Sequence, residues 1–294
     1  MKIAIYGQSY TSNTQNSIHT LLDLLLHKKV EVTIENEFFN EIIKGGASSE
    51  TYHVFKTFKS LDNSIDLLIS IGGDGTILRA ITFVRDLSIP IVGINTGRLG
   101  FLSTIQTNEI EGAVCQILSG NFKISERTLL SVETDPKNKD INELNFALNE
   151  IAVSRKNTTA MIKVETHLNG EYLTSYWADG LIISTPTGST SYSLSCGGPV
   201  ITPNTGSFVL TPIAPHNLSA RPLVIPNDTT IQLKVDGREE HYLMSLDSRI
   251  ATLHNSTIIT IKKAAFKIKM VELINESFID TLRKKLLWGE DKRN

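Results

Sequence analysis

The segment Gly72-Gly-Asp-Gly-Thr76 places an acidic side chain in a glycine-rich turn that directly follows an apolar stretch. Such turns usually bind phosphate through backbone N–H groups, so the role of Asp74 needs a separate explanation. Asp74 could cap a helix that begins here, which is worth about 1 kcal/mol. Alternatively, its carboxylate could accept a hydroxyl proton, or hold a metal ion that neutralises phosphate, while the glycines allow a close backbone approach. The sequence leaves both explanations open.

Two common nucleotide-binding motifs are excluded for this segment. The dinucleotide fingerprint G-x-G-x-x-G lacks its third glycine, and no Gly-Lys-Ser/Thr follows to make a Walker A loop. The segment nevertheless comes at the carboxyl end of a predicted parallel strand, where open α/β sheets bind ligands.

A second polar feature is the pair Asn149-Glu150, which interrupts the otherwise apolar strand pattern from Phe146 to Val153. Adjacent strand residues face opposite sides, so one of the pair could simply face solvent. An amide next to a carboxylate is also a suitable arrangement for binding ribose hydroxyls. Either explanation fits the strand pattern.

Two further segments combine rigid backbone with polar side chains. Residues 177–199 are rich in hydroxyls and glycines between apolar flanks, which suits binding of adenine and phosphate without charged side chains. Residues 211–224 combine prolines with His216 and Arg221. A lone histidine is more often a hydrogen-bonded structural residue than a catalyst.

Composition narrows the class of protein. The formal net charge of -2 disfavours a nucleic-acid partner, and no segment reaches the roughly 18 apolar residues of a membrane span. Cys115 and Cys196 have no metal-ligand spacing, and no paired histidine motif occurs. We therefore expect a cytoplasmic protein with no metal site made by a side-chain cluster, in which any metal arrives with phosphates.

The elements that must position these segments fall into two classes. Over residues 1–120, buried strands at 2–6, 30–34, 65–71 and 89–93 alternate with helical periods at 18–25, 75–87 and 108–119, which predicts an open, mostly parallel α/β sheet. After residue 120, short strand patterns separated by turns such as Asn169-Gly170 and Asp236-Gly237 predict a β-rich domain. Residues 278–288 return to a helical period, with Phe278, Leu282 and Leu286 on one face.

Four motifs in this order resemble those of the bacterial NAD kinases, and the resemblance covers nearly the whole chain. The Gly72–Thr76 segment alone is shared with phosphofructokinases and with diacylglycerol and sphingosine kinases. Asn149-Glu150, Asp179-Gly-Leu-Ile-Ile-Ser-Thr-Pro-Thr-Gly-Ser-Thr190 and Pro215-His-Asn-Leu-Ser-Ala-Arg-Pro-Leu223 are specific to the family.

The resemblance implies a Rossmann-like α/β domain (1–120), an all-β, sandwich-like NAD-binding domain (121–272), and a C-terminal helix (273–294) that packs back on the N-terminal domain. In the family the two domains meet over a cleft. It further implies transfer of the terminal phosphoryl group of ATP to the 2′-hydroxyl of the adenosine ribose of NAD, with a divalent metal cation, Mg²⁺ being expected. The family also suggests a homodimer or homotetramer.

Site residues are carried over from the resemblance by their motif positions. Asp74 would be the catalytic base or would orient the hydroxyl, and Gly73 and Gly75 would give the phosphates room. Asp179 would contact the nicotinamide end or an adenine. The implied NAD- and ATP-binding residues are Gly73, Gly75, Arg79, Asn149, Glu150, Asp179, Thr190, Ser191, Tyr192, Ser193, Leu194, Ser195, Ala214 and Arg249.

Some positions depart from the family pattern, and other functions compete. Ala160, Trp177 and Arg249 stand where relatives place other side chains, which leaves the choice between NAD and NADH open. A lipid kinase would not need Asn149-Glu150 or the hydroxyl-rich segment. A non-catalytic dinucleotide sensor would tend to lose Asp74, and a dehydrogenase would need the missing fingerprint.

Overall fold

The computed structural model describes residues 1–46, 52, 54–157, 160–274 and 276–287. Its contacts divide the chain into two compact units: unit 1 comprises residues 1–126 and 268–294, and unit 2 comprises residues 127–267. The chain passes from one unit to the other inside two long strands, β7 (Phe122–Asp135) and β18 (Ile258–Leu273). The borders predicted from sequence, after residues 120 and 272, lie at the ends of these same strands.

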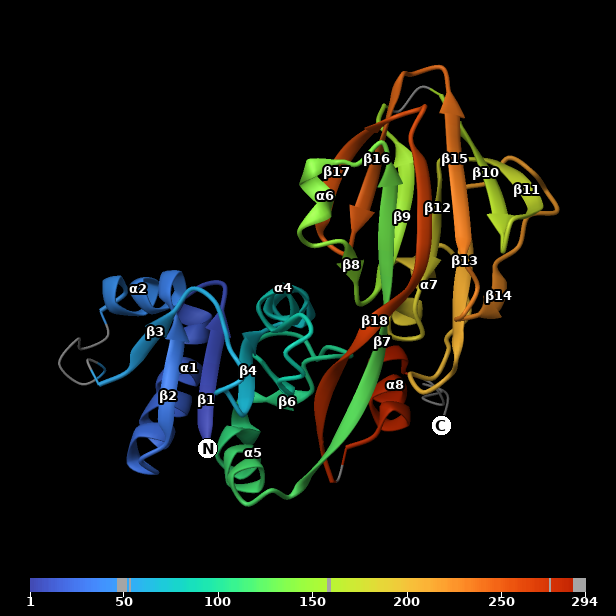
Figure 1. Cartoon of the computed structure of the whole chain (residues 1–294). Helices are drawn as coiled ribbons and strands as arrows, with labels where there is room; N and C mark the ends of the chain where they lie inside the picture. The colour runs from blue at the N-terminus through green and yellow to red at the C-terminus, as the bar shows by residue number, and fades with distance from the viewer. Residues whose placement is uncertain (47–51, 53, 158–159, 275, 288–294) are drawn as a thin grey trace. The chain divides into compact units, whose positions relative to one another are not determined.

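Unit 1 is an α/β domain with a parallel sheet. Its strands lie in the order β18-β5-β4-β1-β2-β3, with β6 beside β5, and every pair is parallel (Figure 1). The elements are β1 (Lys2–Gly7), α1 (Ser12–His27), β2 (Glu31–Glu35), α2 (Asn36–Lys44), β3 (Lys56–Phe58), β4 (Leu67–Gly72), α4 (Asp74–Val84), β5 (Ile91–Asn95), β6 (Ile105–Gln106), the 3₁₀ turn η1 (Thr107–Glu109), α5 (Ile110–Leu118) and α8 (Phe278–Leu286).

Side chains alternate between the two faces of the sheet along each strand, and both faces are buried. Ile3, Ile69 and Val92 pack in one core with the apolar faces of α1 and α5. On the opposite face α4 packs closely enough that a Cβ at Gly93 would overlap Ile77. Helices on both faces explain why the strands have nearly continuous apolar sequences. The α/β fold predicted for this part of the chain is confirmed.

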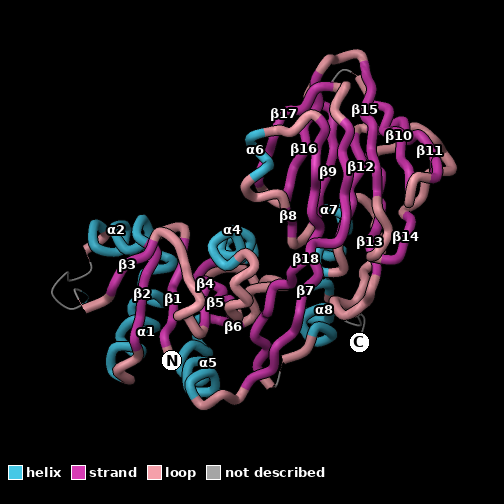
Figure 2. The backbone as a smooth tube through the Cα atoms, viewed as in Figure 1, coloured by secondary structure: helices cyan, strands magenta, loops and turns pink. Residues whose placement is uncertain are grey.

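Unit 2 consists almost entirely of strands (Figure 2), and its β8–β7, β9–β12, β9–β16, β10–β11, β10–β15, β12–β13, β13–β14, β15–β18 and β16–β17 pairs are antiparallel. One sheet has the order β14-β13-β12-β9-β16-β17, and the other contains β11-β10-β15-β18 together with β7 and β8. The elements are α6 (Lys139–Asn142), β8 (Phe146–Ala147), β9 (Glu150–Arg155), β10 (Ile162–Leu168), β11 (Glu171–Ala178), β12 (Gly180–Ser184), η2 (Thr187–Thr190), α7 (Tyr192–Ser195), β13 (Ser207–Ile213), β14 (Leu223–Pro226), β15 (Ile231–Gly237), β16 (His241–Leu246) and β17 (Arg249–His254).

The core of unit 2 lies between its two sheets. Val164 and Leu233 of one sheet and Val153, Leu181 and Tyr242 of the other belong to a single buried cluster. This arrangement confirms the predicted all-β, sandwich-like domain. Strands β11, β14 and β17 were not among the predicted strands; each has exposed residues at several positions, which weakens its apolar signal.

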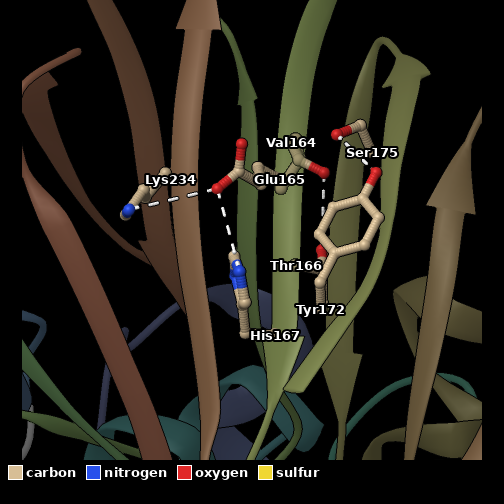
Figure 3. Close-up of polar contacts among 7 residues, drawn as sticks. All are labelled: Val164, Glu165, Thr166, His167, Tyr172, Ser175 and Lys234. Atoms are coloured by element: carbon tan, nitrogen blue, oxygen red, sulfur yellow. Dashed lines mark hydrogen bonds and ion pairs between the residues drawn. The ribbon is translucent and has the colours of Figure 1, made fainter. Parts of the chain in front are cut away.

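Polar side chains of the β10–β11–β15 region contact one another, both along single strands and between β10 and β15 (Figure 3). The Glu165 carboxylate lies 3.9 Å from His167 Nε2 and 4.0 Å from Lys234 Nζ, and the Tyr172 hydroxyl lies 3.2 Å from the Ser175 hydroxyl. Polar residues here alternate with buried ones such as Val164 and Thr166. The pattern is that of a strand with one face toward the core and one toward water.

The C-terminal helix α8 belongs to unit 1, as predicted. Leu282 is its one buried residue among those described, and Phe278 and Leu286 on the same face are partly buried. Ser277 caps the helix by accepting the Asp280 N–H. Trp288, which the sequence pattern included in this helix, lies outside the described residues. Among the helices that the structure describes, none is long and apolar enough to cross a membrane.

Candidate functional site

Asp74 is the first residue of α4, and its carboxylate points away from the helix that it begins. The N-cap is Gly73, so of the two explanations that the sequence left open for Asp74, capping of this helix is not the one found. Asp74 Oδ2 accepts the Phe101 N–H at 2.8 Å, and Oδ1 accepts those of Leu102 at 3.0 Å and Ser103 at 2.9 Å. The carboxylate is therefore fixed by three consecutive backbone donors of another loop, and it also lies at the positive end of the α4 dipole.

Glycines around Asp74 fall into two groups. A Cβ at Gly100 would overlap the Asp74 carboxylate, and Gly72 has a φ of +152° with Thr76 directly beside it, so the fold itself requires glycine at both positions. A Cβ at Gly73 or Gly75 would meet nothing within 4 Å. The internal packing does not require glycine at these two positions, so the space beside them is open to a ligand.

In unit 2, Asn149-Glu150 lies at a break between two strand segments. β8 ends at Ala147 and β9 begins at Glu150. The backbone N–H groups of this break are held by Asp247: its Oδ2 accepts from Leu148 at 3.0 Å, and its Oδ1 accepts from Asn149 at 2.8 Å and Glu150 at 3.2 Å. Asp247 occupies the β16–β17 turn with a φ of +53°, a conformation that aspartate and asparagine tolerate best after glycine.

Glu150 is a buried carboxyl group with unused hydrogen-bonding capacity. The residue is 6% exposed, and Oε2 has no hydrogen-bond partner among the described residues. Burial, and next the Asp247 carboxylate, raise the pKa of Glu150 from 4.5 to about 8, against hydrogen bonds from the Ser191 side chain and the Tyr192 backbone. A buried polar atom without a partner needs an explanation, and a bound ligand is one.

The hydroxyl-rich segment packs against this strand break. Thr185 N–H donates to the Asn149 carbonyl at 2.9 Å, and Thr185 Oγ1 donates to the Leu148 carbonyl at 2.6 Å. A Cβ at Gly188 would overlap the Asn149 backbone, so this glycine permits a close approach. Several hydroxyls thus shape the protein itself, and the buried Ser193 hydroxyl likewise bonds to Thr211 Oγ1 at 2.8 Å.

The remaining residues predicted to bind ligand differ in their surroundings. Tyr192 and Ser195 are exposed, Ser191 and Leu194 are half-buried, and the Thr190 hydroxyl donates to the Thr187 carbonyl at 3.1 Å. Asp179 forms an ion pair of 2.9 Å with Arg155. Ala214 directly follows β13 with a φ of +43°, and Arg79 is exposed on α4.

Arg249 is engaged with its own unit. Its guanidinium donates to the carbonyls of Leu144 and Phe146 and lies over the Phe146 ring, 5.2 Å from the centroid. Burial lowers the pKa of Arg249, and the Asp247 carboxylate opposes this shift. The arginine thus supports the same turn that carries Asp247.

The structure gathers the predicted residues into two sets. Unit 1 holds Gly73, Asp74 and Gly75 at the start of α4, with Arg79 on the same helix; unit 2 places Asn149 and Glu150 against the segment that contains Ser191 and Tyr192. Sequence reasoning missed Gly100 and Asp247. The turn sequence Leu246-Asp-Ser-Arg249 was a signal for the second. No group of three acidic, histidine or cysteine side chains among the described residues could hold a metal ion.

Comparison with known proteins relates both sets to one family. Residues 8–122 match the family model of the ATP-NAD kinase N-terminal domain, and residues 148–273 match that of the ATP-NAD kinase C-terminal domain. Over all 294 residues of both chains, the sequence is 60% identical to an NAD kinase of Christiangramia forsetii and 58% identical to one of Flavobacterium psychrophilum.

Two solved structures share this fold over nearly the whole chain. Yeast NADH kinase, solved with NADH, aligns with a TM-score of 0.85 at 26% identity, covering 99% of this chain and 89% of the yeast protein. An NAD kinase from Archaeoglobus fulgidus, solved with ATP, aligns with a TM-score of 0.74 at 26% identity, covering 98% and 99%. The matched domains, the full-length identity and the shared fold together show that this chain belongs to the ATP-NAD kinase family.

Proposed function

We infer that the chain is an NAD kinase, which transfers the terminal phosphoryl group of ATP to the 2′-hydroxyl of the adenosine ribose of NAD and so forms NADP. Family membership supports the reaction, since relatives of full length and high identity are named NAD kinases. The observation in this structure that carries the proposal furthest is that Oε2 of Glu150, buried beside Asn149, has no hydrogen-bond partner within the described part of the chain.

A ribose hydroxyl suits Glu150 in either protonation state. With a pKa of about 8, the carboxyl group is mostly protonated at neutral pH and can donate a hydrogen bond. When ionised, it can only accept. A hydroxyl both donates and accepts, and the neighbouring Asn149 amide offers both kinds of partner as well. We therefore assign Asn149 and Glu150 to the ribose hydroxyls of NAD.

Asp74 is the proposed catalytic residue. A carboxylate has about four acceptor positions, and three of those on Asp74 are taken by backbone N–H groups, so about one remains for a substrate hydroxyl. The three donors restrict rotation of the carboxylate, which favours a fixed orientation toward that hydroxyl. Phosphoryl transfer depends mainly on positioning and charge neutralisation, and an oriented carboxylate contributes to the first.

The other assignments follow the family motif, one residue at a time. Open space beside Gly73 and Gly75 supports their proposed role next to phosphates. We propose the same NAD- and ATP-binding role for Arg79, Asp179, Thr190, Ser191, Tyr192, Ser193, Leu194, Ser195, Ala214 and Arg249. For Ser193 and Arg249 this role would be added to the structural contacts that each already makes.

A divalent cation, Mg²⁺ in our proposal, is expected to arrive with ATP. Mg²⁺ commonly binds through one or two carboxylates and substrate phosphates, and this fits a chain whose described residues include no three-ligand cluster. When bound, the ion would neutralise phosphate charge. We also propose that the protein works as a homodimer or homotetramer in the cytoplasm.

The direct test is to incubate the purified protein with ATP, Mg²⁺ and NAD and to measure NADP with an NADP-specific dehydrogenase. NADP formation is the expected result, and parallel reactions with NADH would establish the preferred acceptor. Absence of NADP, with NAD binding retained in calorimetry, would favour a dinucleotide sensor over a kinase. Light scattering on the same sample measures the number of subunits.

A further inference from the structure

The orientation of Asp74 depends on the loop formed by residues 99–104. All three backbone donors to its carboxylate, from Phe101, Leu102 and Ser103, belong to this loop. A movement of the loop would therefore move the carboxylate or release it. What fixes the loop consequently also fixes the proposed catalytic group.

The loop contains two buried residues, Leu102 and Ser103, and the Ser103 hydroxyl donates to the Gly72 carbonyl at 3.4 Å, while its two ends depend on other contacts. Residues 99–104 lie between β5 and β6 and belong to neither a helix nor a strand. Inside the loop, the Gly100 N–H donates to the Ser103 carbonyl at 3.3 Å, and Asn95 of β5 donates to the same carbonyl at 3.2 Å. A cavity of about 370 Å³ adjoins Leu99 and Thr104, so part of the loop lacks close packing.

The C-terminal segment contacts this loop at its beginning, middle and end. Lys285 Nζ of α8 donates to the Leu99 carbonyl and lies 5.8 Å from the centroid of the Phe101 ring. The Phe278 ring lies 6.5 Å from the same ring. At the end of the loop, the Thr104 hydroxyl donates to Glu276 Oε2 at 2.7 Å.

We propose that α8 positions Asp74 through this loop and that Lys285 is the main positioning residue. The inference rests on the proposed function, in which Asp74 faces the substrate hydroxyl. Lys285 makes two of the contacts, one by a charge-assisted hydrogen bond to the loop backbone and one over an aromatic ring. It touches neither Asp74 nor any residue assigned to NAD or ATP, so its loss should affect turnover more than substrate binding.

Substitution of Lys285 by methionine removes the ammonium group and keeps the length of the side chain. We expect kcat to fall about 5- to 10-fold, because small displacements of a catalytic group are costly. The KM values for NAD and ATP should stay within about twofold, since no proposed substrate contact is lost. Lys285→Arg keeps a donor and should restore at least about half of the lost kcat.

Lys284→Met is the control for charge, because it removes the same charge from the neighbouring residue of α8, which acts on the Glu276 carboxylate through its charge, whereas Lys285 donates directly to the loop backbone. Its kcat should equal that of the wild type. Hydrogen exchange measured by mass spectrometry supplies a readout independent of catalysis. Peptides that cover residues 99–104 should exchange faster in Lys285→Met than in Lys284→Met, in the absence of nucleotide.

Each outcome bears on a distinct proposal. A wild-type protein that forms no NADP would overturn the proposed function, while the exchange experiment would still test contact between Lys285 and the loop. An active wild type with an unchanged kcat in Lys285→Met, or an equal loss in Lys284→Met, would overturn the positioning role. If Lys285→Met folds poorly, Thr104→Val tests the same idea from the other end of the loop, where we expect kcat to fall about threefold at unchanged KM.

Discussion

Asp74 in unit 1 and Asp247 in unit 2 use the same local geometry for different purposes. Each carboxylate accepts the backbone N–H groups of three consecutive residues: 101–103 for Asp74 and 148–150 for Asp247. Asp74 lies in a glycine-rich turn with open space beside Gly73 and Gly75. Asp247 lies in a tight turn against the strand break of Asn149-Glu150.

The difference is one of surroundings rather than of hydrogen bonding. Open space beside one aspartate leaves an acceptor position for a substrate, whereas the other aspartate fixes backbone next to a buried carboxyl group. Burial raises the pKa of Asp247, and its three backbone donors oppose that shift. A carboxylate held by three N–H groups is thus a rigid element in both units, and only the neighbouring space decides whether it can do chemistry.

The largest expected effect comes from removing the charge of Asp74. Asp74→Asn should lower kcat about 100-fold or more, because a general base typically contributes about 10²–10⁴-fold. The free energy of unfolding should also fall, by about 1–3 kcal/mol, because an amide nitrogen would replace one of the two oxygens that accept from the loop. NADP formation and urea unfolding measure the two effects. A kcat near that of the wild type would remove Asp74 from the catalytic role.

For Asp247 we expect stability and NAD binding to be affected more than turnover. Asp247→Asn replaces one accepting oxygen by an amide nitrogen beside backbone donors, so the free energy of unfolding should fall by about 2–3 kcal/mol. Asparagine tolerates the positive φ, which keeps the turn intact. Because Asn149 and Glu150 would lose their support, the KM for NAD should rise more than kcat falls. A loss confined to kcat would contradict the comparison.

The pH dependence of stability tests the environment of Glu150, the buried carboxyl group beside Asp247. Its pKa of about 8 in the folded chain exceeds its ordinary value of 4.5, so the unfolded chain releases the proton at lower pH than the folded chain does. The free energy of unfolding of the wild type, relative to that of Glu150→Gln, should therefore fall by about 1 kcal/mol per pH unit as the pH rises from 4.5 toward 8. Above pH 8 this difference should stay constant.

Unfolding in urea at several pH values measures this difference between Glu150→Gln and the wild type. Because the Asp247 carboxylate contributes to the raised pKa of Glu150, the levelling pH should move below 8 in Asp247→Asn. Parallel stability curves for the wild type and Glu150→Gln would refute the assignment of a raised pKa.

The smallest effect is expected at a carboxylate without backbone donors. Glu165 faces His167 and Lys234 on the sheet surface at 3.9 Å and 4.0 Å (Figure 3). Exposed ion pairs contribute little, so Glu165→Gln should change the free energy of unfolding by less than about 0.5 kcal/mol. Turnover should equal that of the wild type. A loss as large as that of Asp247→Asn would show that three backbone donors do not make the two aspartates more important for stability than a surface carboxylate such as Glu165.

Regular elements with strong periodicity were predictable. The buried strands of unit 1 are apolar because helices cover both faces, and α4 and α5 have clear apolar faces, so each element was predicted within a few residues of its observed bounds. Strands β11, β14 and β17 were missed because exposed residues interrupt their apolar pattern. No helix was predicted near Ser193, where α7 forms, because a helix of a single turn gives no periodic signal in the sequence.

The sequence by itself determined the two fold classes, the family resemblance and the motifs that contain Asp74, Asn149 and Glu150, because these depend on local composition and order. Tertiary structure alone decided the partners of those side chains. Residues 101–103 are distant in sequence from Asp74, Asp247 is distant from Asn149, and Lys285 is distant from Leu99. Such contacts form only when the chain folds, because hydrogen-bond partners and burial depend on what packing brings together rather than on spacing along the sequence.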